Sequence, residues 1–147
     1  VTGRPPKINL QDEKYCQSFL RDAILKNFIA SSHDVSDGGL AVALSECCIL
    51  SSKGANIQLE EKNARIDSLL FSEGGSRIIF SLNQDEESNF LNFLKLKSKD
   101  FEQHVYVKKI GFVSEENLDI TFQEKRLCNL TVDELTEKFN NSISSCF

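Results

Sequence analysis

Two carboxylates, a hydroxyl and a pair of glycines lie close together in residues 33–40, which read His-Asp-Val-Ser-Asp-Gly-Gly-Leu. An apolar stretch with helical spacing follows, so we expect a helix to begin near Ser36. Amides at a helix start attract anions, and glycine lets a ligand approach the backbone closely. Mg²⁺ prefers oxygen ligands and keeps phosphate oxygens and water in its shell. The segment therefore predicts a polyanion site, with Asp34 as the metal ligand because Asp37 would serve the helix N-terminus.

A purely structural interpretation of the same residues stays open. Ser36 or Asp37 would then be an ordinary helix cap, and Gly38 and Gly39 would pack closely against a neighbouring element. The glycine spacing matches neither a phosphate-binding loop of the Walker type nor a dinucleotide-binding fingerprint. The chain has two histidines and no serine or cysteine elbow, so a catalytic triad is disfavoured.

A second candidate site is the turn at residues 73–77, which reads Glu-Gly-Gly-Ser-Arg and leads into an apolar stretch. The guanidinium of Arg77 can bind a phosphate through two parallel hydrogen bonds, and Glu73 places a carboxylate at the other end of the turn. The alternative is a surface turn closed by a Glu73–Arg77 ion pair, which would contribute about 0–1 kcal/mol.

The helices that must position these residues follow from the spacing of apolar side chains. Intervals of three and four residues predict helices over residues 12–29, 36–50 and 85–97, and a short helix or turn over residues 67–71. Gly54 is expected to form the left-handed cap that ends the second of these helices. A Thr131-x-x-Glu134 capping box opens a last helix that extends to about residue 140.

Alternating apolar and polar residues predict the strands, which are expected over residues 55–59, 77–82, 104–113, 118–122 and 127–130. Residues 31–36 are expected to form a polar junction, and residues 115–117 a hairpin-like turn. Together these elements predict an α/β (α+β) fold, in which helices cover a mixed, mainly antiparallel sheet.

Composition excludes several classes of protein. Of the 147 residues, 40% are hydrophobic and 27% charged, as in ordinary globular domains, and the net charge of −5 comes without a basic stripe. Nucleic acid is therefore not an expected partner. The longest strictly apolar run, residues 40–44, is too short to span a membrane. Five cysteines without a Cys-x-x-Cys pair argue against disulfides and zinc, and indicate a cytoplasmic protein.

The sequence contains no methionine, which predicts a fragment of a longer chain or a processed N-terminus. Pro5 and Pro6 favour an extended segment. We therefore expect residues 1–9 to form a linker and residues 10–147 to form one domain.

Three segments in order carry a resemblance to a known family. They are Gly-Arg-Pro-Pro-Lys-Ile at residues 3–8, the segment 33–46 that includes the first motif, and Leu-Leu-Phe-Ser-Glu-Gly-Gly-Ser-Arg-Ile at residues 69–78. The chain resembles the C-terminal domain of the small bacterial form of formylglycinamidine ribonucleotide synthase, in the aminoimidazole ribonucleotide synthetase superfamily. The resemblance implies a fold that is partly ferredoxin-like.

The resemblance also implies an activity. The family is an ATP-dependent ligase of purine biosynthesis, which joins ammonia from glutamine to formylglycinamide ribonucleotide and gives formylglycinamidine ribonucleotide, ADP and phosphate. The amide oxygen is activated by phosphorylation and then displaced. The implied partners are the remaining domains of the same synthetase chain, a separate glutaminase subunit and a small bridging subunit, and the isolated domain is expected to be inactive.

Residue roles carry over where the motifs match. The resemblance implies that Asp34 binds Mg²⁺ and that Ser36 contacts nucleotide, together with Asp37, Gly38 and Gly39. Glu73 and Arg77 match the downstream motif, but Gly74-Gly75 stand where the family has Ser-Gln, so two side chains that could hydrogen-bond substrate are missing. This domain belongs to the second half of a duplicated synthetase, so its nucleotide site can be auxiliary and structural rather than catalytic.

Two other interpretations stay open. The chain can come from a related ATP-using enzyme of the selenide or thiamine-phosphate kinase type, whose helix starts are similar. It can also be a purely structural module of a synthetase, in which the residues named above serve packing alone.

Overall fold

Residues 7–61, 64–97, 101 and 104–142 are described by the structure, a computed structural model. The chain divides into two units, each built from two separate segments. The first is drawn from Val1–Asp37 and Glu73–Lys108, and the second from Gly38–Ser72 and Lys109–Phe147. Of the expected linker, residues 1–6 lie outside the described part, and residues 7–9 form neither helix nor strand.

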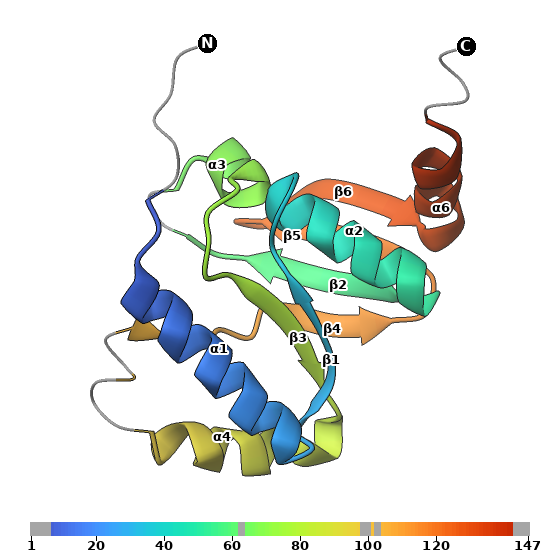
Figure 1. The fold of residues 1–147 in the computed structure, drawn as a ribbon. Helices are drawn as coiled ribbons and strands as arrows, with labels where there is room; N and C mark the ends of the chain where they lie inside the picture. The colour runs from blue at the N-terminus through green and yellow to red at the C-terminus, as the bar shows by residue number, and fades with distance from the viewer. Residues whose placement is uncertain (1–6, 62–63, 98–100, 102–103, 143–147) are drawn as a thin grey trace. The chain divides into compact units, whose positions relative to one another are not determined.

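The first unit consists of a two-stranded ribbon and the helices that pack on it (Figure 1). Its elements are α1 (Leu10–Leu25), β1 (Ile29–Asp34), β3 (Ile78–Leu82), the short 3₁₀ helix η1 (Gln84–Glu86) and α4 (Glu87–Lys95). β1 and β3 are antiparallel, and Asp34 lies opposite Ile78. Helices were expected over residues 12–29 and 85–97, so both are confirmed with shifted ends.

Aromatic side chains form the core of the first unit. Phe19 and Ala23 of α1 are buried with Phe90 of α4 and Phe101. The Phe90 ring lies 6.0 Å from that of Phe19 and 5.5 Å from that of Phe80 on β3, both edge-on. Such edge-to-face pairs add about 0.5–1.5 kcal/mol each beyond the burial of apolar area. The core therefore ties both helices to the ribbon whose end carries Asp34.

α1 begins and ends at local signals. Asn9 caps its start, with Oδ1 accepting hydrogen bonds from the Gln11 amide at 3.0 Å and the Asp12 amide at 3.4 Å. Asn27 adopts a left-handed conformation with φ 59°, and the Phe28 amide donates to the Ala23 carbonyl at 3.1 Å. This is a Schellman motif, and it ends the helix before the residue 29 that the apolar spacing predicted.

β1 covers residues 31–34 of the expected polar junction at residues 31–36, so that prediction was wrong for these four residues. Most of its residues are exposed, and the strand shows no apolar alternation. Its backbone is nevertheless paired with β3 from Ile29 to Asp34. All five residues of β3 are half-buried, because the ribbon has only two strands.

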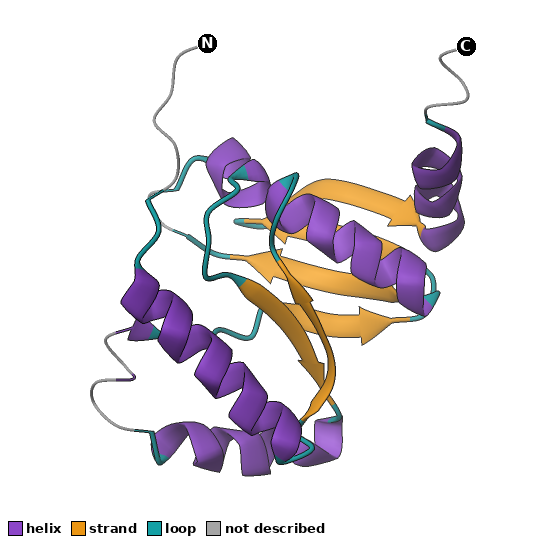
Figure 2. Cartoon of the chain, viewed as in Figure 1, coloured by secondary structure: helices purple, strands orange, loops and turns teal. Residues whose placement is uncertain are grey.

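The second unit is a four-stranded sheet with helices. Its elements are α2 (Gly39–Ser51), β2 (Gly54–Leu59), α3 (Ile66–Phe71), β4 (Gly111–Ser114), β5 (Asn117–Phe122), β6 (Lys125–Thr131) and α6 (Val132–Asn141). The strand order is β4-β2-β5-β6, with β2 and β5 parallel and the other pairs antiparallel. α2 lies across one face of this sheet (Figure 2), where Ile57, Leu59, Leu118 and Ile120 are buried. The mixed α/β prediction is confirmed, with two sheets instead of one.

Three further local predictions were wrong. Residues 104–113 form a strand only from Gly111, after the paired lysines Lys108 and Lys109. The turn at residues 115–117 does not close a hairpin, because β2 lies between β4 and β5. The left-handed cap of α2 is Ser52 with φ 53°, whereas Gly54 begins β2, where a β-carbon would lie 2.3 Å from the Asn117 carbonyl oxygen.

The capping box of α6 is confirmed. The Glu134 amide donates to Thr131 Oγ1 at 3.1 Å, and the Thr131 amide donates to Glu134 Oε2 at 2.8 Å. The bond from the Thr131 amide, with that from its hydroxyl, lowers the pKa of Glu134 below its ordinary value of 4.5. A carboxyl whose pKa is depressed by folding stabilises the fold above its unfolded pKa and loses that contribution as the pH falls through the folded value.

We therefore expect α6 to fray in acid. Amide exchange measured by NMR from about pH 6 to pH 3 should show α6 losing protection below about pH 4.5, the ordinary Glu pKa. Glu134→Gln keeps a side chain that completes a capping box but removes the titration, so its α6 protection should not follow this acid transition. An equal pH response in both proteins would contradict the role of the carboxylate.

No helix in the described ranges is long and apolar enough to cross a membrane. Among the described residues Cys16, Cys47, Cys48 and Cys128 are free thiols, as expected from their spacing. Burial raises the pKa of the Cys48 thiol to about 11, which keeps it protonated near neutral pH and removes it as a nucleophile.

Candidate functional site

The two sequence motifs meet at one end of the β1–β3 ribbon. Asp34 is the last residue of β1 and pairs with Ile78, the first residue of β3. The Val35 amide then donates to the Arg77 carbonyl at 2.9 Å. Residues that are about forty positions apart in the sequence thus share one local backbone ladder inside the first unit.

Asp34 presents its carboxylate outward. Its side chain is 76% exposed, and the neighbouring His33 Nδ1 lies 3.9 Å from Oδ1. The same His33 nitrogen lies 2.6 Å from the Asp34 carbonyl oxygen, which fixes the imidazole beside the strand end. An exposed carboxylate beside a strand end is accessible to a hydrated cation.

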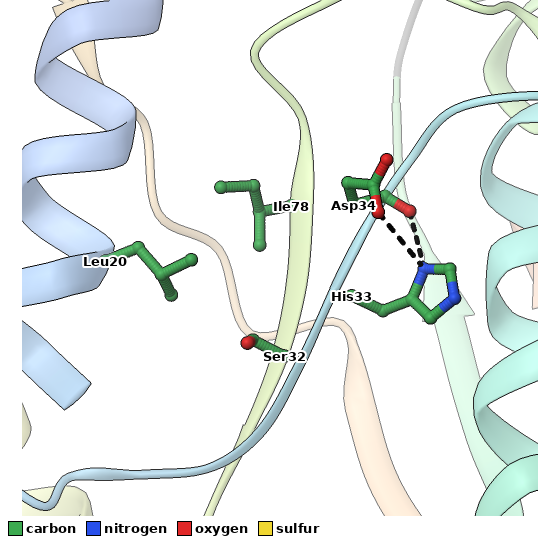
Figure 3. Close-up of a pocket in the computed structure, with 5 residues that line it drawn as sticks. All are labelled: Leu20, Ser32, His33, Asp34 and Ile78. Atoms are coloured by element: carbon green, nitrogen blue, oxygen red, sulfur yellow. Dashed lines mark hydrogen bonds and ion pairs between the residues drawn. The ribbon is translucent and has the colours of Figure 1, made fainter.

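An open pocket of about 310 Å³ adjoins this carboxylate. It is lined by Leu20 of α1, Ser32, His33 and Asp34 of β1, and Ile78 of β3. Figure 3 shows the Leu20 and Ile78 side chains in the space between α1 and the ribbon, while the His33 ring lies on the other side of β1, below Asp34. The pocket therefore combines an apolar wall with one charged group at its rim.

Ser36 and Asp37 lie between β1 and α2, and both are exposed. The prediction that one of them caps α2 was wrong, because the N-cap is Gly38 with φ 77° and no side-chain hydrogen bond. The side chain of an N-cap residue normally accepts a hydrogen bond from the amide two or three residues further on. In α2 the N-cap position is occupied by Gly38, which has no side chain. Asp37 is not used as a cap, so capping does not distinguish it from Asp34 as a metal ligand.

Gly38 and Gly39 have structural reasons to be glycine. Both have positive φ, of 77° and 72°. A β-carbon at Gly38 would lie 2.4 Å from Val42 Cγ2, and one at Gly39 would lie 2.7 Å from the Leu70 carbonyl oxygen and 2.8 Å from Phe71 backbone atoms. The space left by the missing β-carbon of Gly39 is therefore filled by the end of α3, as the structural interpretation of this motif expected.

The turn at residues 73–77 is held on α1. Ser76 has a left-handed backbone with φ 60°, and its hydroxyl donates to Glu13 Oε2 at 2.6 Å. The Cys16 thiol donates to the Ser76 carbonyl at 3.8 Å. Hydrogen bonds from the Ser76 hydroxyl, and then from the Gln17 side chain, hold the pKa of Glu13 below its ordinary value.

Arg77 and Glu73 occupy different environments at this turn. Arg77 is half-buried, and burial lowers the pKa of its guanidinium, which nevertheless stays charged at neutral pH. Glu73 is exposed. Arg77 directly precedes β3, and its backbone lies beside the end of β1 that carries Asp34.

Three residues of this region, Glu13, Leu20 and Ser32, are not marked by any motif in the sequence. Glu13 and Ser76 are 63 positions apart, and Leu20 reads only as part of the apolar face of α1. No local pattern marks such a contact, because it depends on how α1 packs on the ribbon.

The described part of the chain contains no group of three or more His, Cys, Asp or Glu side chains arranged to hold a metal. A site made by Asp34 would therefore supply at most two such side chains from the described residues and leave the other positions to water and ligand oxygens. This arrangement suits Mg²⁺, which is commonly held by one or two carboxylates and substrate phosphates. It does not suit zinc, which takes three or four protein ligands.

Similar proteins carry one recurring name. A protein of Prochlorococcus marinus subsp. pastoris, named phosphoribosylformylglycinamidine synthase subunit PurL, is 84% identical over 147 residues, which are 100% of this chain and 19% of that protein. One of the same name from P. marinus strain MIT 9313 is 43% identical over 144 residues, which are 97% of this chain and 18% of that protein. The chain thus spans about a fifth of the length of these relatives.

Solved structures share the fold. Phosphoribosylformylglycinamidine synthase II from Thermotoga maritima matches with a TM-score of 0.72 at 17% identity, over 89% of this chain and 22% of that one. T. maritima PurL complexed with ATP matches with a TM-score of 0.67 at 18% identity, over 84% of this chain and 21% of that one. The family described as "AIR synthase related protein, C-terminal domain" matches residues 2–120. This chain therefore belongs to the family of C-terminal domains of AIR synthase related proteins.

Proposed function

We propose that this chain is the C-terminal domain of a phosphoribosylformylglycinamidine synthase. The full protein would convert formylglycinamide ribonucleotide, ammonia and ATP to formylglycinamidine ribonucleotide, ADP and phosphate, in the cytoplasm. The observation that carries the proposal is the 84% identity over all 147 residues to a protein of that name. The three ordered segments at residues 3–8, 33–46 and 69–78 support the same assignment.

The proposed role of this domain is to contribute part of a nucleotide site. Asp34 would hold Mg²⁺, and its exposed carboxylate fits a cation that keeps water and phosphate oxygens. Ser36, Asp37 and the backbone at Gly38 and Gly39 would contact the nucleotide. Arg77 would bind a phosphate group, with Glu73 at the same turn. The metal would neutralise phosphate charge, and these residues would bind and orient the nucleotide. Positioning and electrostatics dominate phosphoryl transfer.

The proposed partners follow from the size of the relatives. The chain spans 19% of the first relative, so the remaining domains of the synthetase would complete the site. A T. maritima structure named PurLQS, with a TM-score of 0.71, supports an assembly with further subunits. We propose a glutaminase subunit that supplies ammonia and a small bridging subunit as those partners, and no activity for this domain alone.

Asp34→Asn in the full-length gene product tests the site. Turnover with MgATP, formylglycinamide ribonucleotide and ammonium should fall about 100-fold if this carboxylate holds a working metal, the usual scale for losing one preorganised charge contact. If the site is auxiliary, turnover should stay while the nucleotide that copurifies with the protein is lost. Initial rates and nucleotide content measured on the same preparation separate the two results.

Asp85→Asn is the matched control, because Asp85 is an exposed aspartate of the same unit on η1. It should change neither rate nor nucleotide content. A wild-type protein without synthetase activity would overturn the proposed function. If the Asp34→Asn protein keeps both its turnover rate and its bound nucleotide, the role of this domain is structural.

A further inference from the structure

We propose that the hydrogen bond between Glu13 and Ser76 is a positioning contact, which sets Arg77 beside the Asp34 end of β1 for binding a phosphate-bearing substrate. The inference rests on the proposed function, and it assigns a role to two residues that the sequence motifs do not connect. Neither residue is a catalytic residue, because both act through Arg77.

The turn before Arg77 contains a residue with a left-handed backbone, Ser76. Ser76 directly precedes Arg77 and adopts φ 60°, a conformation that costs a non-glycine residue free energy. The Ser76 hydroxyl donates to Glu13 Oε2 at 2.6 Å, a short charge-assisted hydrogen bond, and the Ser76 carbonyl accepts from the Cys16 thiol at 3.8 Å. Glu13 and Cys16 lie three residues apart on one face of α1. Together they hold the unfavourable backbone of Ser76.

The backbone of Arg77 is hydrogen-bonded to the end of β1 that carries Asp34. The Arg77 carbonyl accepts from the Val35 amide at 2.9 Å, directly after Asp34, and Ile78 pairs with Asp34. Arg77 is therefore fixed on one side by the ribbon and on the other by the turn that Glu13 holds. The Glu13 contact acts on the residue directly before Arg77, so it constrains the turn side of the Arg77 backbone.

The glycines of the turn explain why an external contact is needed. A β-carbon at Gly74 would meet nothing within 4 Å, and one at Gly75 would lie no closer than 4.0 Å to Ile8. Packing does not restrain these two positions, and glycine has the largest backbone freedom of any residue. The hydrogen bond that Ser76 makes with α1 therefore restrains a turn that packing at these two glycines leaves unrestrained.

Glu13 itself is prepared for this role. Gln17 donates to Glu13 Oε1 at 2.6 Å, which orients the carboxylate along α1 and leaves Oε2 to Ser76. Because the carboxylate only accepts hydrogen bonds from these partners, glutamine can replace it and keep an acceptor for Ser76.

The test uses the full-length gene product with MgATP and formylglycinamide ribonucleotide as probes. Ser76→Gly removes the hydroxyl without strain at φ 60°, and Glu13→Ala removes the acceptor. Each should raise the KM for one of the two phosphate-bearing substrates about tenfold and leave kcat within twofold, because uniform binding is lost. The substrate whose KM rises identifies which phosphate Arg77 binds. Glu13→Gln should restore the KM to within about threefold, and the double variant should not exceed the single ones.

Asn89→Ala is the matched control, because Asn89 donates to Glu86 Oε2 at 3.1 Å, another exposed hydrogen bond of the same unit. Its KM values should be unchanged. If both KM values are unchanged in Ser76→Gly and Glu13→Ala while Asp34→Asn loses turnover or nucleotide, the positioning role is overturned and the proposed function stands. If Asp34→Asn also has no effect, the positioning role is overturned and this domain keeps only a structural role in the synthetase. A fall in kcat and thermal stability together, without a KM change, also overturns the positioning role.

Discussion

Gly39→Ala should destabilise the second unit by about 2–5 kcal/mol, from the left-handed backbone that alanine disfavours and the overpacking it introduces. Gly39 has φ 72°, and the new methyl group would lie 2.7–2.8 Å from backbone atoms of Leu70 and Phe71. Backbone atoms of a helix end cannot rotate away as a side chain can. Hydrogen exchange of the full-length protein should show lost protection in α2 and α3.

Gly74→Ala is the matched control. Gly74 has no positive φ, and a β-carbon there would meet nothing within 4 Å. The change should leave stability unchanged or raise it by about 0.4–1 kcal/mol, because alanine restricts the unfolded chain. Equal protection of α2 and α3 in Gly39→Ala and Gly74→Ala would show that α3 does not press on Gly39.

Phe90→Ala should have the largest effect in the first unit and lower the free energy of unfolding by about 3–5 kcal/mol. Removing a buried aromatic ring loses its apolar contacts and leaves a cavity. Phe90 is 3% exposed, and its ring contacts those of Phe19, Phe28, Phe80 and Phe93. Loss of this ring removes the contact that Phe90 of α4 makes with Phe80 of β3. Amide protection in α1, β3 and α4 should fall together in hydrogen exchange.

The adjacent Leu91→Ala provides the comparison, because Leu91 is 48% exposed on the same helix. Leucine and alanine are both strong helix formers, so this change leaves the helix propensity of α4 nearly unchanged. At a partly exposed site it should lower the free energy of unfolding by less than about 1 kcal/mol. Similar losses in both variants would mean that α4 is held by its helicity alone and not by the aromatic core.

Elements with a strong local signal were predictable from the sequence. Apolar spacing identified α1, α2 and α4, and Thr131 with Glu134 marked the start of α6, because these signals depend on neighbours three or four residues apart. β1 was missed because its residues are mostly exposed, and its backbone partners lie in β3. The left-handed residues Asn27 and Ser52 set helix ends that glycine positions did not predict.

The candidate site was predictable as a set of residues but not as a geometry. Asp34 and Arg77 came from two motifs, and their proximity depends on the register of β1 with β3. Glu13 gave no signal, because its contact spans 63 positions. The glycines were ambiguous in the sequence, since close packing and ligand approach both favour a residue without a side chain. The β-carbon distances at Gly39 show close packing on α3.

The interleaving of the two units also constrains how the chain acquires its structure during synthesis. β2 is one of the two inner strands of its sheet, but both of its neighbours, β4 and β5, follow it only after the whole of Glu73–Lys108. A nascent chain therefore carries β2 with both edges unpaired while the second segment of the first unit is made. Unpaired strand edges are prone to association, and long-range pairing is slow. Neither unit can be released by a single cut, so a truncation anywhere between residues 38 and 108 leaves both incomplete.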